Sequence, residues 1–362
     1  MKIVTFGEIM GRIDAKGFMK FRQSLPGPLY MTFAGAEANV AASLAILGRE
    51  VVFMTALPNN DITEACLDTL RGIKVNTNYI VKTAKGRLGL YFVEKGANQR
   101  PSKVIYDRSH SSVSMTSHEA YNWDEAFDGA GWFHITGITP SLSKIAADAS
   151  LYAVKKAKEK GLTVSCDLNF RKKLWQWDEN LAPHELAEKI MRQILPYVDV
   201  VIANEEDASD VLKINAGETD VDSGYLEIDK YPFVARKIVE QFPNVQKVAI
   251  TLRESISATH NNWGAMLYDK TEDAAYFAPI QDGKYQPYQI KNIVDRVGGG
   301  DSFAAGLIFA LTEESLPSLQ EKLSFAVAAS CLAHSIQGDF NYSTKEEVLN
   351  LMKGSASGRV IR

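Results

Sequence analysis

The sequence predicts an α/β protein: a central, mostly parallel sheet with helices on both faces, plus a small β-sheet lid. Two observations predict the sheet. Short apolar runs typical of buried strands alternate with helical patterns from residue 131 onward, and a similar run at 2–7 adds an earlier strand. Two strand-like segments without this alternation, 11–33 and 79–110, predict the lid. We expect one domain over 1–362, with the lid inserted in it.

The elements follow in chain order. Strands are expected at 2–7, 51–56, 132–136, 163–167, 198–203 and 248–252. The small-residue run from Ala34 leads into an expected helix that ends at about Leu47. Further helices are expected at about 61–70, 143–160, 183–195, 205–212, 231–241, 301–313, 318–335 and 344–352. The acidic segment 213–230 is interpreted as a solvated loop without an assigned function.

Composition limits the possible partners. The net charge of −4 lacks the basic excess of a nucleic-acid-binding protein, so we expect a small-molecule partner. The widely spaced Cys66, Cys166 and Cys331 form no metal or disulfide framework and indicate buried thiols in a reducing compartment. No signal-peptide pattern and no membrane-spanning window occurs, so a cytoplasmic location and no membrane partner are expected.

A glycine-rich stretch near the C-terminus is the main candidate site. Gly298, Gly299 and Gly300 precede Asp301 and an apolar run that favours a helix. A helix that begins at such a turn directs unpaired N–H groups and its positive dipole end at an anion, usually phosphate. Asp301 would then be placed to act as a base. Alternatively, the glycines form a flexible turn and Asp301 is only an N-cap; the stretch alone leaves both interpretations open.

The other polar patches narrow the chemistry. Ligands of open α/β sheets bind beyond the carboxyl ends of strands, where Gly7-Glu8, Asp167 to Arg171, Asn204 to Asp207 and Thr251 to Arg253 are expected. The chain has no Walker A loop, no dinucleotide fingerprint after its first strand, no H-E-x-x-H and no G-x-S-x-G. An anion site beside an acid suits phosphoryl transfer to a hydroxyl.

The patch after residue 203 has two interpretations. Asn204, Glu206 and Asp207 could hold a hydrated Mg²⁺, an ion that keeps most of its water and takes few carboxylates. Equally, Asn204 could cap a helix whose acids complement the dipole.

Several strings resemble the ribokinase/PfkB family of sugar kinases over nearly the whole chain. Residues Asp295 to Gly306 are similar to its C-terminal signature D-T-x-G-A-G-D-x-F-x-x-G, and Gly35 to Asn39 match the N-terminal one. Within the family, the chain is most similar to 2-keto-3-deoxygluconate kinases. That similarity is carried by Gly86-Arg87-Leu88-Gly89-Leu90-Tyr91-Phe92, the run from Arg100 to Arg108, Asp167-Leu168-Asn169-Phe170-Arg171 and Ser357-Gly358-Arg359.

The resemblance implies a ribokinase-like fold and an ATP- and Mg²⁺-dependent kinase, with a monovalent cation left open. It makes Asp301 the general base for the sugar's primary hydroxyl, and it makes Gly298, Gly299 and Gly300 the anion hole. It implies substrate contacts at Gly35, Asn39, Tyr91, Tyr106, Arg108, Asn169, Arg171 and Asp339. It places nucleotide and phosphate contacts at Asn204, Thr251, Arg253, Gly298 and Gly300, and metal contacts at Glu206 or Asp207, where the family's N-x-x-E becomes N-x-x-D.

The residue types favour an acidic sugar. Guanidinium groups such as those of Arg108 and Arg171 pair bidentately with carboxylates, and Tyr91 and Tyr106 offer ring faces and hydroxyls. Alternatively, the tyrosines only pack the lid and Arg108 forms a surface ion pair. We expect phosphorylation of the terminal hydroxyl of 2-keto-3-deoxygluconate. A neutral-sugar kinase of the fructokinase or ribokinase type and a catalytically silent sugar-acid sensor remain alternatives.

The lid also suggests self-association. Apolar residues occupy both alternations of its strands, with Leu90, Phe92 and Val104 on one and Tyr91, Val93 and Ile105 on the other. Because exposed strand edges favour pairing as well, a homodimer through the lid is expected.

Overall fold

The computed structural model describes residues 1–204, 206–214 and 228–354. Glu205, most of the predicted acidic loop and the string Ser357-Gly358-Arg359 lie outside the described residues. No helix of these ranges is both long and apolar enough to span a bilayer.

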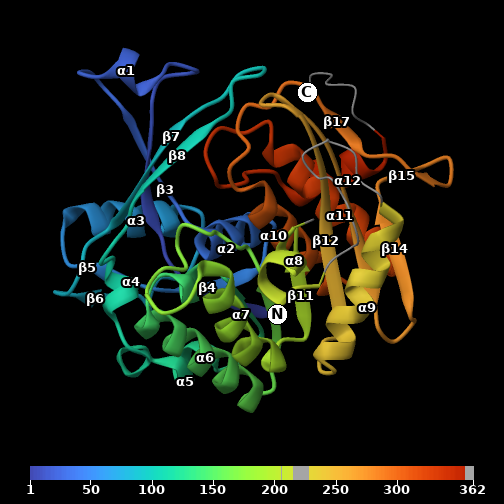
Figure 1. Ribbon diagram of the computed structural model, residues 1–362, viewed down its shortest axis with the longest axis horizontal. Coiled ribbons are helices and arrows are strands. Elements are labelled where there is room, and N and C mark those ends of the chain that lie inside the picture. The colour runs from blue at the N-terminus through green and yellow to red at the C-terminus, as the bar shows by residue number, and fades with distance from the viewer. Residues whose placement is uncertain (205, 215–227, 355–362) are drawn as a thin grey trace.

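The main sheet confirms the predicted α/β class (Figure 1). Its strand order is β14-β13-β12-β11-β10-β9-β1-β4, and β17 pairs with β13. The strands from β4 to β12 are parallel and, apart from the second half of β12, mostly buried, as expected for a sheet covered on both faces. The bounds are β1 Lys2–Phe6, β4 Glu50–Met54, β9 Ala130–Thr136, β10 Thr163–Asp167, β11 Val200–Ala203, β12 Lys247–Ser257, β13 His260–Asp269, β14 Ala274–Ala278 and β17 Tyr288–Ile290.

The sheet differs from the expectation at one edge. The strand expected at 248–252 continues to Ser257 as β12 and pairs antiparallel with β13, with Thr251 opposite Ala265. Strands β13, β14 and β17, all antiparallel additions, were not predicted. Short pairs complete the strands: β5 Ala56–Pro58 with β6 Val81–Thr83, and β15 Ile280–Gln281 with β16 Lys284–Tyr285.

Helices cover both faces of the sheet and enclose two apolar cores. One face carries α2 Ala36–Ile46, α3 Asp61–Gly72, α10 Gly299–Leu311, α11 Leu319–Ala333 and α12 Lys345–Met352. The other carries α5 Trp123–Phe127, α6 Lys144–Glu159, α7 Pro183–Ile194, α8 Asp207–Leu212 and α9 Tyr231–Gln241. Helix α10 is buried along almost its whole length. It packs closely on α11 because Gly306 has no side chain: a Cβ there would lie only 2.9 Å from the Ala326 Cα.

A separate sheet projects from this body at the upper left of Figure 1, where it ends in the short helix α1 Phe21–Ser24. Its strand order is β3-β2-β7-β8, and we call it the lid sheet. The strands are β2 Met10–Asp14, β3 Tyr30–Ala34, β7 Gly89–Glu94 and β8 Lys103–Asp107. The remaining short helix, α4 Ser112–Met115, follows β8.

The register of β7 and β8 corrects the expected faces of the lid sheet. Tyr91 pairs with Tyr106 and Val93 with Val104, and paired residues share a face. The inner face therefore presents Tyr91, Val93, Val104 and Tyr106, whereas Leu90, Phe92 and Ile105 point outward. The prediction that grouped Val104 with Phe92 is wrong because the turn between the strands shifts the alternation by one residue.

Candidate active site

A cavity of about 320 Å³ lies between the inner face of the lid sheet, the carboxyl ends of the central strands and the start of α10. It brings together almost every residue that the sequence singled out. These are Gly35, Asn39, Tyr91, Tyr106, Arg108, Asn169, Arg171, Asn204, Asp207, Thr251, Arg253, Gly298, Gly299, Gly300, Asp301 and Asp339. Only Glu206 of the predicted set is not part of the lining; it is exposed and lies at the N-cap of α8.

The glycine turn forms the floor of the cavity. Gly298 is the N-cap of α10 and has φ +85°, a left-handed conformation that glycine adopts without a steric penalty. A Cβ there would lie 2.6 Å from the carbonyl oxygen of Asp339. The first N–H groups of α10 have no partner within the helix, so the turn offers donors and a positive dipole end to an anion.

Asp301 stands in the first turn of α10, with its carboxylate facing the cavity. Its Oδ2 accepts a hydrogen bond of 2.6 Å from Asn39 Nδ2. Burial raises the pKa of Asp301 to about 6, opposed by the Asn39 hydrogen bond and assisted by the charge of Asp339. A carboxyl with a pKa near 6 is ionised at neutral pH yet is basic enough to accept a proton from a hydroxyl in the transition state.

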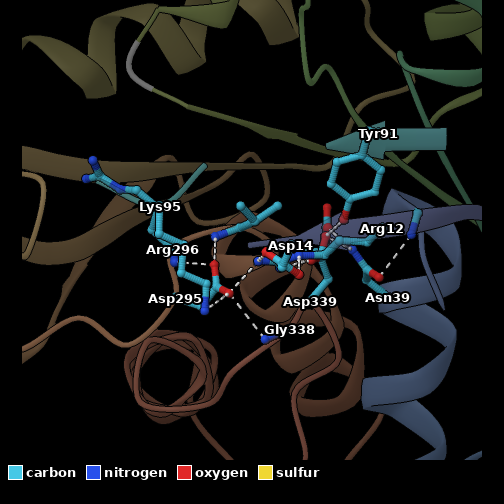
Figure 2. Close-up of polar contacts among 12 residues, drawn as sticks. Arg12, Asp14, Asn39, Tyr91, Lys95, Asp295, Arg296, Gly338 and Asp339 are labelled. Atoms are coloured by element: carbon cyan, nitrogen blue, oxygen red, sulfur yellow. Dashed lines mark hydrogen bonds and ion pairs between the residues drawn. The ribbon is translucent and has the colours of Figure 1, made fainter. Parts of the chain in front are cut away.

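Asn39 and Asp339 lie next to each other and form a polar wall of the cavity (Figure 2). The Gly35 N–H donates to Asn39 Oδ1 at 3.1 Å, which leaves the Asn39 amide nitrogen directed at the carboxylates. That nitrogen lies 3.5 Å from Asp339 Oδ2, which also accepts a 2.7 Å hydrogen bond from the Tyr91 hydroxyl. Asp339 is thereby held as an acceptor on the cavity wall.

Guanidinium groups line the cavity on two sides. Arg108 of the lid is buried and paired with Glu8, with 2.8 Å from its Nε to Glu8 Oε2. Arg108 is therefore neither a surface ion pair nor an uncompensated charge. Arg171 is exposed and donates to its neighbour's carbonyl, the Phe170 oxygen, at 2.7 Å. Asn169 beside it has φ +40°, an unusual conformation for a residue other than glycine, of a kind that clusters at functional sites.

The acidic patch after β10 and β11 is organised by backbone hydrogen bonds. The carboxylate of Asp207 accepts from the Phe170 N–H at 3.0 Å and from the Asn204 N–H at 2.9 Å. Asn204 Oδ1 in turn accepts from the N–H groups of Glu206 and Asp207, which is the capping arrangement. Burial raises the pKa values of Asp207 and of Asp167, which lies close enough for their charges to repel.

This patch fits a hydrated ion better than a dehydrated one. Among residues 1–204, 206–214 and 228–354, no group of three or more His, Cys, Asp or Glu side chains is arranged to hold a metal. Mg²⁺ retains several waters and commonly takes only one or two carboxylates together with substrate phosphates. Asn204 and Asp207 on the cavity wall suit that mode of binding.

The cavity lining also contains Arg296, Trp263 and His334, which the sequence did not single out. Arg296 lies near the predicted Arg253, and burial together with the charge of Arg253 lowers the pKa of Arg296. The ring of Trp263 lies 5.0 Å from that of His334, whose pKa burial lowers to about 4, so this imidazole is neutral. Trp263 lies in strand β13, which was not predicted. Arg296 lies within the stretch from Asp295 to Gly306, so its position there could have identified it.

Comparisons with known proteins match this chain to carbohydrate kinases. A family model described as "pfkB family carbohydrate kinase" matches residues 1–344. The crystal structure of 2-dehydro-3-deoxygluconokinase from Thermotoga maritima has 44% identity and a TM-score of 0.87, over 98% of this chain and 100% of that one. A 2-dehydro-3-deoxygalactonokinase of Haloferax volcanii is 28% identical over 99% of this chain and 98% of its own length. Fructokinase with bound ATP from Xylella fastidiosa shares the fold, with 23% identity and a TM-score of 0.75, over 98% of this chain and 99% of that one.

Proposed function

We propose, from the premise that the chain belongs to the PfkB family of carbohydrate kinases, that it phosphorylates the terminal primary hydroxyl of 2-keto-3-deoxygluconate. This sugar acid is also called 2-dehydro-3-deoxygluconate. The protein is a sugar kinase by family; the identity of the sugar and the roles of individual residues are the proposal.

One observation carries the reaction type: Asp301 lies in the first turn of α10, directly beside the anion site at Gly298. Transfer of a phosphoryl group to an alcohol needs donors for the group in flight and a carboxylate for the hydroxyl proton. In the proposal, Asp301 takes that proton, and the N–H groups of Gly299 and Gly300 stabilise the charge on the transferred group. Asn39 holds the Asp301 carboxylate in position.

The acidic substrate is supported by the charges above the glycine turn. Arg171 is placed to pair with a carboxylate, and Arg108 adds a second guanidinium whose charge Glu8 partly balances. Tyr91, Tyr106 and Asp339 supply hydroxyl and carboxylate groups for the sugar hydroxyls. The names of the Thermotoga and Haloferax relatives, which differ in the sugar epimer, agree with this substrate class.

The donor is proposed to be ATP with Mg²⁺. ATP supplies the phosphoryl group, and the ion neutralises phosphate charge. In the proposal, Thr251, Arg253 and Arg296 of the cavity lining contact the phosphates, and Asn204 and Asp207 bind waters of the ion. The fructokinase that shares the fold was solved with ATP bound, which agrees with this assignment. The inner face of the lid sheet then excludes water from the reacting groups.

A substrate panel tests the proposal. ADP release is measured with 2-keto-3-deoxygluconate, its galactonate epimer, fructose and ribose, each with MgATP, and each with and without K⁺ because monovalent-cation activation is also only predicted. We expect kcat/KM to be on the order of 100-fold higher for the sugar acids than for the neutral sugars. A preference for fructose or ribose would identify a neutral-sugar kinase. Binding of the sugar acid by calorimetry without turnover would identify a sensor.

The homodimer is part of the proposal as well. The outward side chains Met31 and Ile105 of the lid sheet are 44% and 56% exposed, an apolar surface that a second lid would cover. Light scattering of the wild-type protein and of Ile105→Glu tests it. We expect a dimer that the variant weakens, and a wild-type monomer at micromolar concentration would contradict it.

A further inference from the structure

The most deeply buried charge of the lid sheet is that of Arg12, in strand β2. Its side chain is fully buried at the centre of the cluster in Figure 2. It forms a two-pronged pair with Asp14 of the same strand, with 2.8 Å from Nε to Oδ2 and 2.9 Å from Nη2 to Oδ1. Arg12 and Asp14 lie on the same face of β2 because they are two residues apart in the strand. With Nε paired to Asp14, the Nη1 and Nη2 groups of Arg12 extend toward the body of the protein.

From this position Arg12 reaches the segment that leads into the glycine turn. Its Nη2 donates to Asp295 Oδ2 at 2.5 Å. The other Asp295 oxygen accepts from the N–H groups of Arg296 and Val297, at 2.9 and 3.3 Å. The residues immediately before Gly298 are therefore held by a carboxylate that Arg12 itself holds.

Arg12 also reaches the cavity wall. Its Nη1 donates to Asp339 Oδ1. The other oxygen, Oδ2, is the one that receives the Tyr91 hydroxyl and lies beside the Asn39 amide. Since Asn39 donates to Asp301, a continuous path of polar contacts joins Arg12 to the proposed base.

The charges of the cluster show what Arg12 contributes. Among the described residues, the carboxylates of Asp14, Asp295 and Asp339 face Arg12, and Lys95 Nζ lies 3.3 Å from Asp295. Without Arg12, these buried carboxylates would repel one another with a single lysine nearby. Burial raises the pKa of Asp339, and Arg12 is the largest influence that lowers it. A buried ion cluster of this kind is weak evidence for stabilisation of the fold, which favours a role in the site.

We propose that Arg12 is a positioning residue for the transfer: it fixes Asp339 as a charged acceptor on the cavity wall and, through Asp295, fixes the approach to the glycine turn. This inference rests on the proposed function of the site, because it assigns Arg12 a role through Asp339 and Asp301. Arg12 contacts neither sugar nor nucleotide in this role.

A double-mutant cycle tests the role. Arg12→Met is expected to lower kcat/KM for the sugar acid on the order of 100-fold, since small misplacements of reacting groups have effects of that size. In an Asp339→Asn background the same substitution is expected to cost less, about tenfold, because the route through Asp339 is already changed and only the contact with Asp295 remains to be lost. A 100-fold loss in both backgrounds, or no loss in either, would overturn the proposal. The matched control is Arg87→Met, which removes a lid arginine paired with Asp107 away from the cavity and should keep wild-type kinetics.

Two further measurements keep the test decisive. If Arg12→Met does not fold, Arg12→Lys replaces it: the charge stays, the fork is lost, and about a tenfold fall in kcat/KM is expected. Wild-type kinetics of folded Arg12→Lys would contradict the proposal. If wild-type protein does not phosphorylate 2-keto-3-deoxygluconate, the proposed substrate fails by itself, and the same cycle is then run with the acceptor of the panel that gives the highest rate.

Discussion

The amide of Asn39 donates a 2.6 Å hydrogen bond to Asp301, although the two residues are 262 positions apart and lie in the first turns of different helices. Because the Gly35 N–H fixes the opposite end of the amide, Asn39 presents a donor and not an acceptor to the carboxylate. This hydrogen bond stabilises the ionised form of Asp301 and lowers its pKa, whereas burial raises that pKa. The proposed base is therefore tuned by two opposing influences, and each can be changed separately.

The pH profile of Asn39→Ala tests this relationship. A base must be deprotonated, so kcat/KM should rise with pH through the Asp301 pKa, about 6 in the wild-type protein. Loss of the donor raises that pKa, so we expect the acidic limb to move upward by on the order of one pH unit. Asn60→Ala removes a helix-capping hydrogen bond far from the site and should leave the limb in place. An unmoved limb in Asn39→Ala would contradict the proposed coupling.

Arg171 and Arg108 predict how the protein selects an acid. Arg171→Ala should raise KM for the sugar acid by on the order of tenfold or more, since a charge-assisted pair is lost, and should leave KM for a neutral sugar unchanged. The single variant Arg108→Ala should also raise KM for the sugar acid, because the buried carboxylate of Glu8 then loses its partner and repels the acid. Steady-state kinetics on both sugars measure this. Equal effects on acid and neutral sugars would argue against carboxylate recognition.

Glu37 predicts a pH dependence of stability. This carboxyl is fully buried in the first turn of α2 and accepts from the hydroxyls of Thr136 and Thr139. Burial raises its pKa to about 7 from an ordinary value of 4.5. Between these values the folded protein binds a proton that the unfolded chain releases, so rising pH lowers the free energy of unfolding, by about 3 kcal/mol when complete.

The matching variant is Glu37→Gln, which cannot ionise. It should lose less stability than the wild-type protein between pH 5 and pH 8, as measured by urea denaturation at each pH. Glu346→Gln, an exposed residue of α12, is the control and should follow the wild-type curve. Parallel curves for Glu37→Gln and wild type would show that Glu37 does not carry this effect.

Much of the fold was predictable because its signals are local. Parallel strands such as β11 are short apolar runs, and the polar residues at the ends of such strands, among them Asp167 and Asn204, meet at one sheet edge by topology alone. The glycine turn was recognisable for the same reason, since turn, acid and helix follow one another in sequence. The hairpin of β12 and β13 was missed because the first half of β13, beginning His260-Asn261-Asn262, is polar.

The remainder depends on partners far apart in the chain. Arg12 resembles a solvated lid residue in sequence, but its carboxylates Asp295 and Asp339 lie 283 and 327 positions away. The pairing of Arg108 with Glu8 spans 100 positions. The local sequence around a charged residue gives no sign of such distant compensation, so its burial could not be predicted.

The turnover of Asp301→Asn is the most direct test of the central claim, that this carboxylate removes the proton of the accepting hydroxyl. It is measured with saturating 2-keto-3-deoxygluconate and MgATP, alongside calorimetric affinity for the sugar. We predict that kcat falls by about 100- to 10,000-fold while the affinity changes little, because the amide keeps the shape of the side chain but cannot act as the base. A kcat close to that of the wild-type protein would contradict the account.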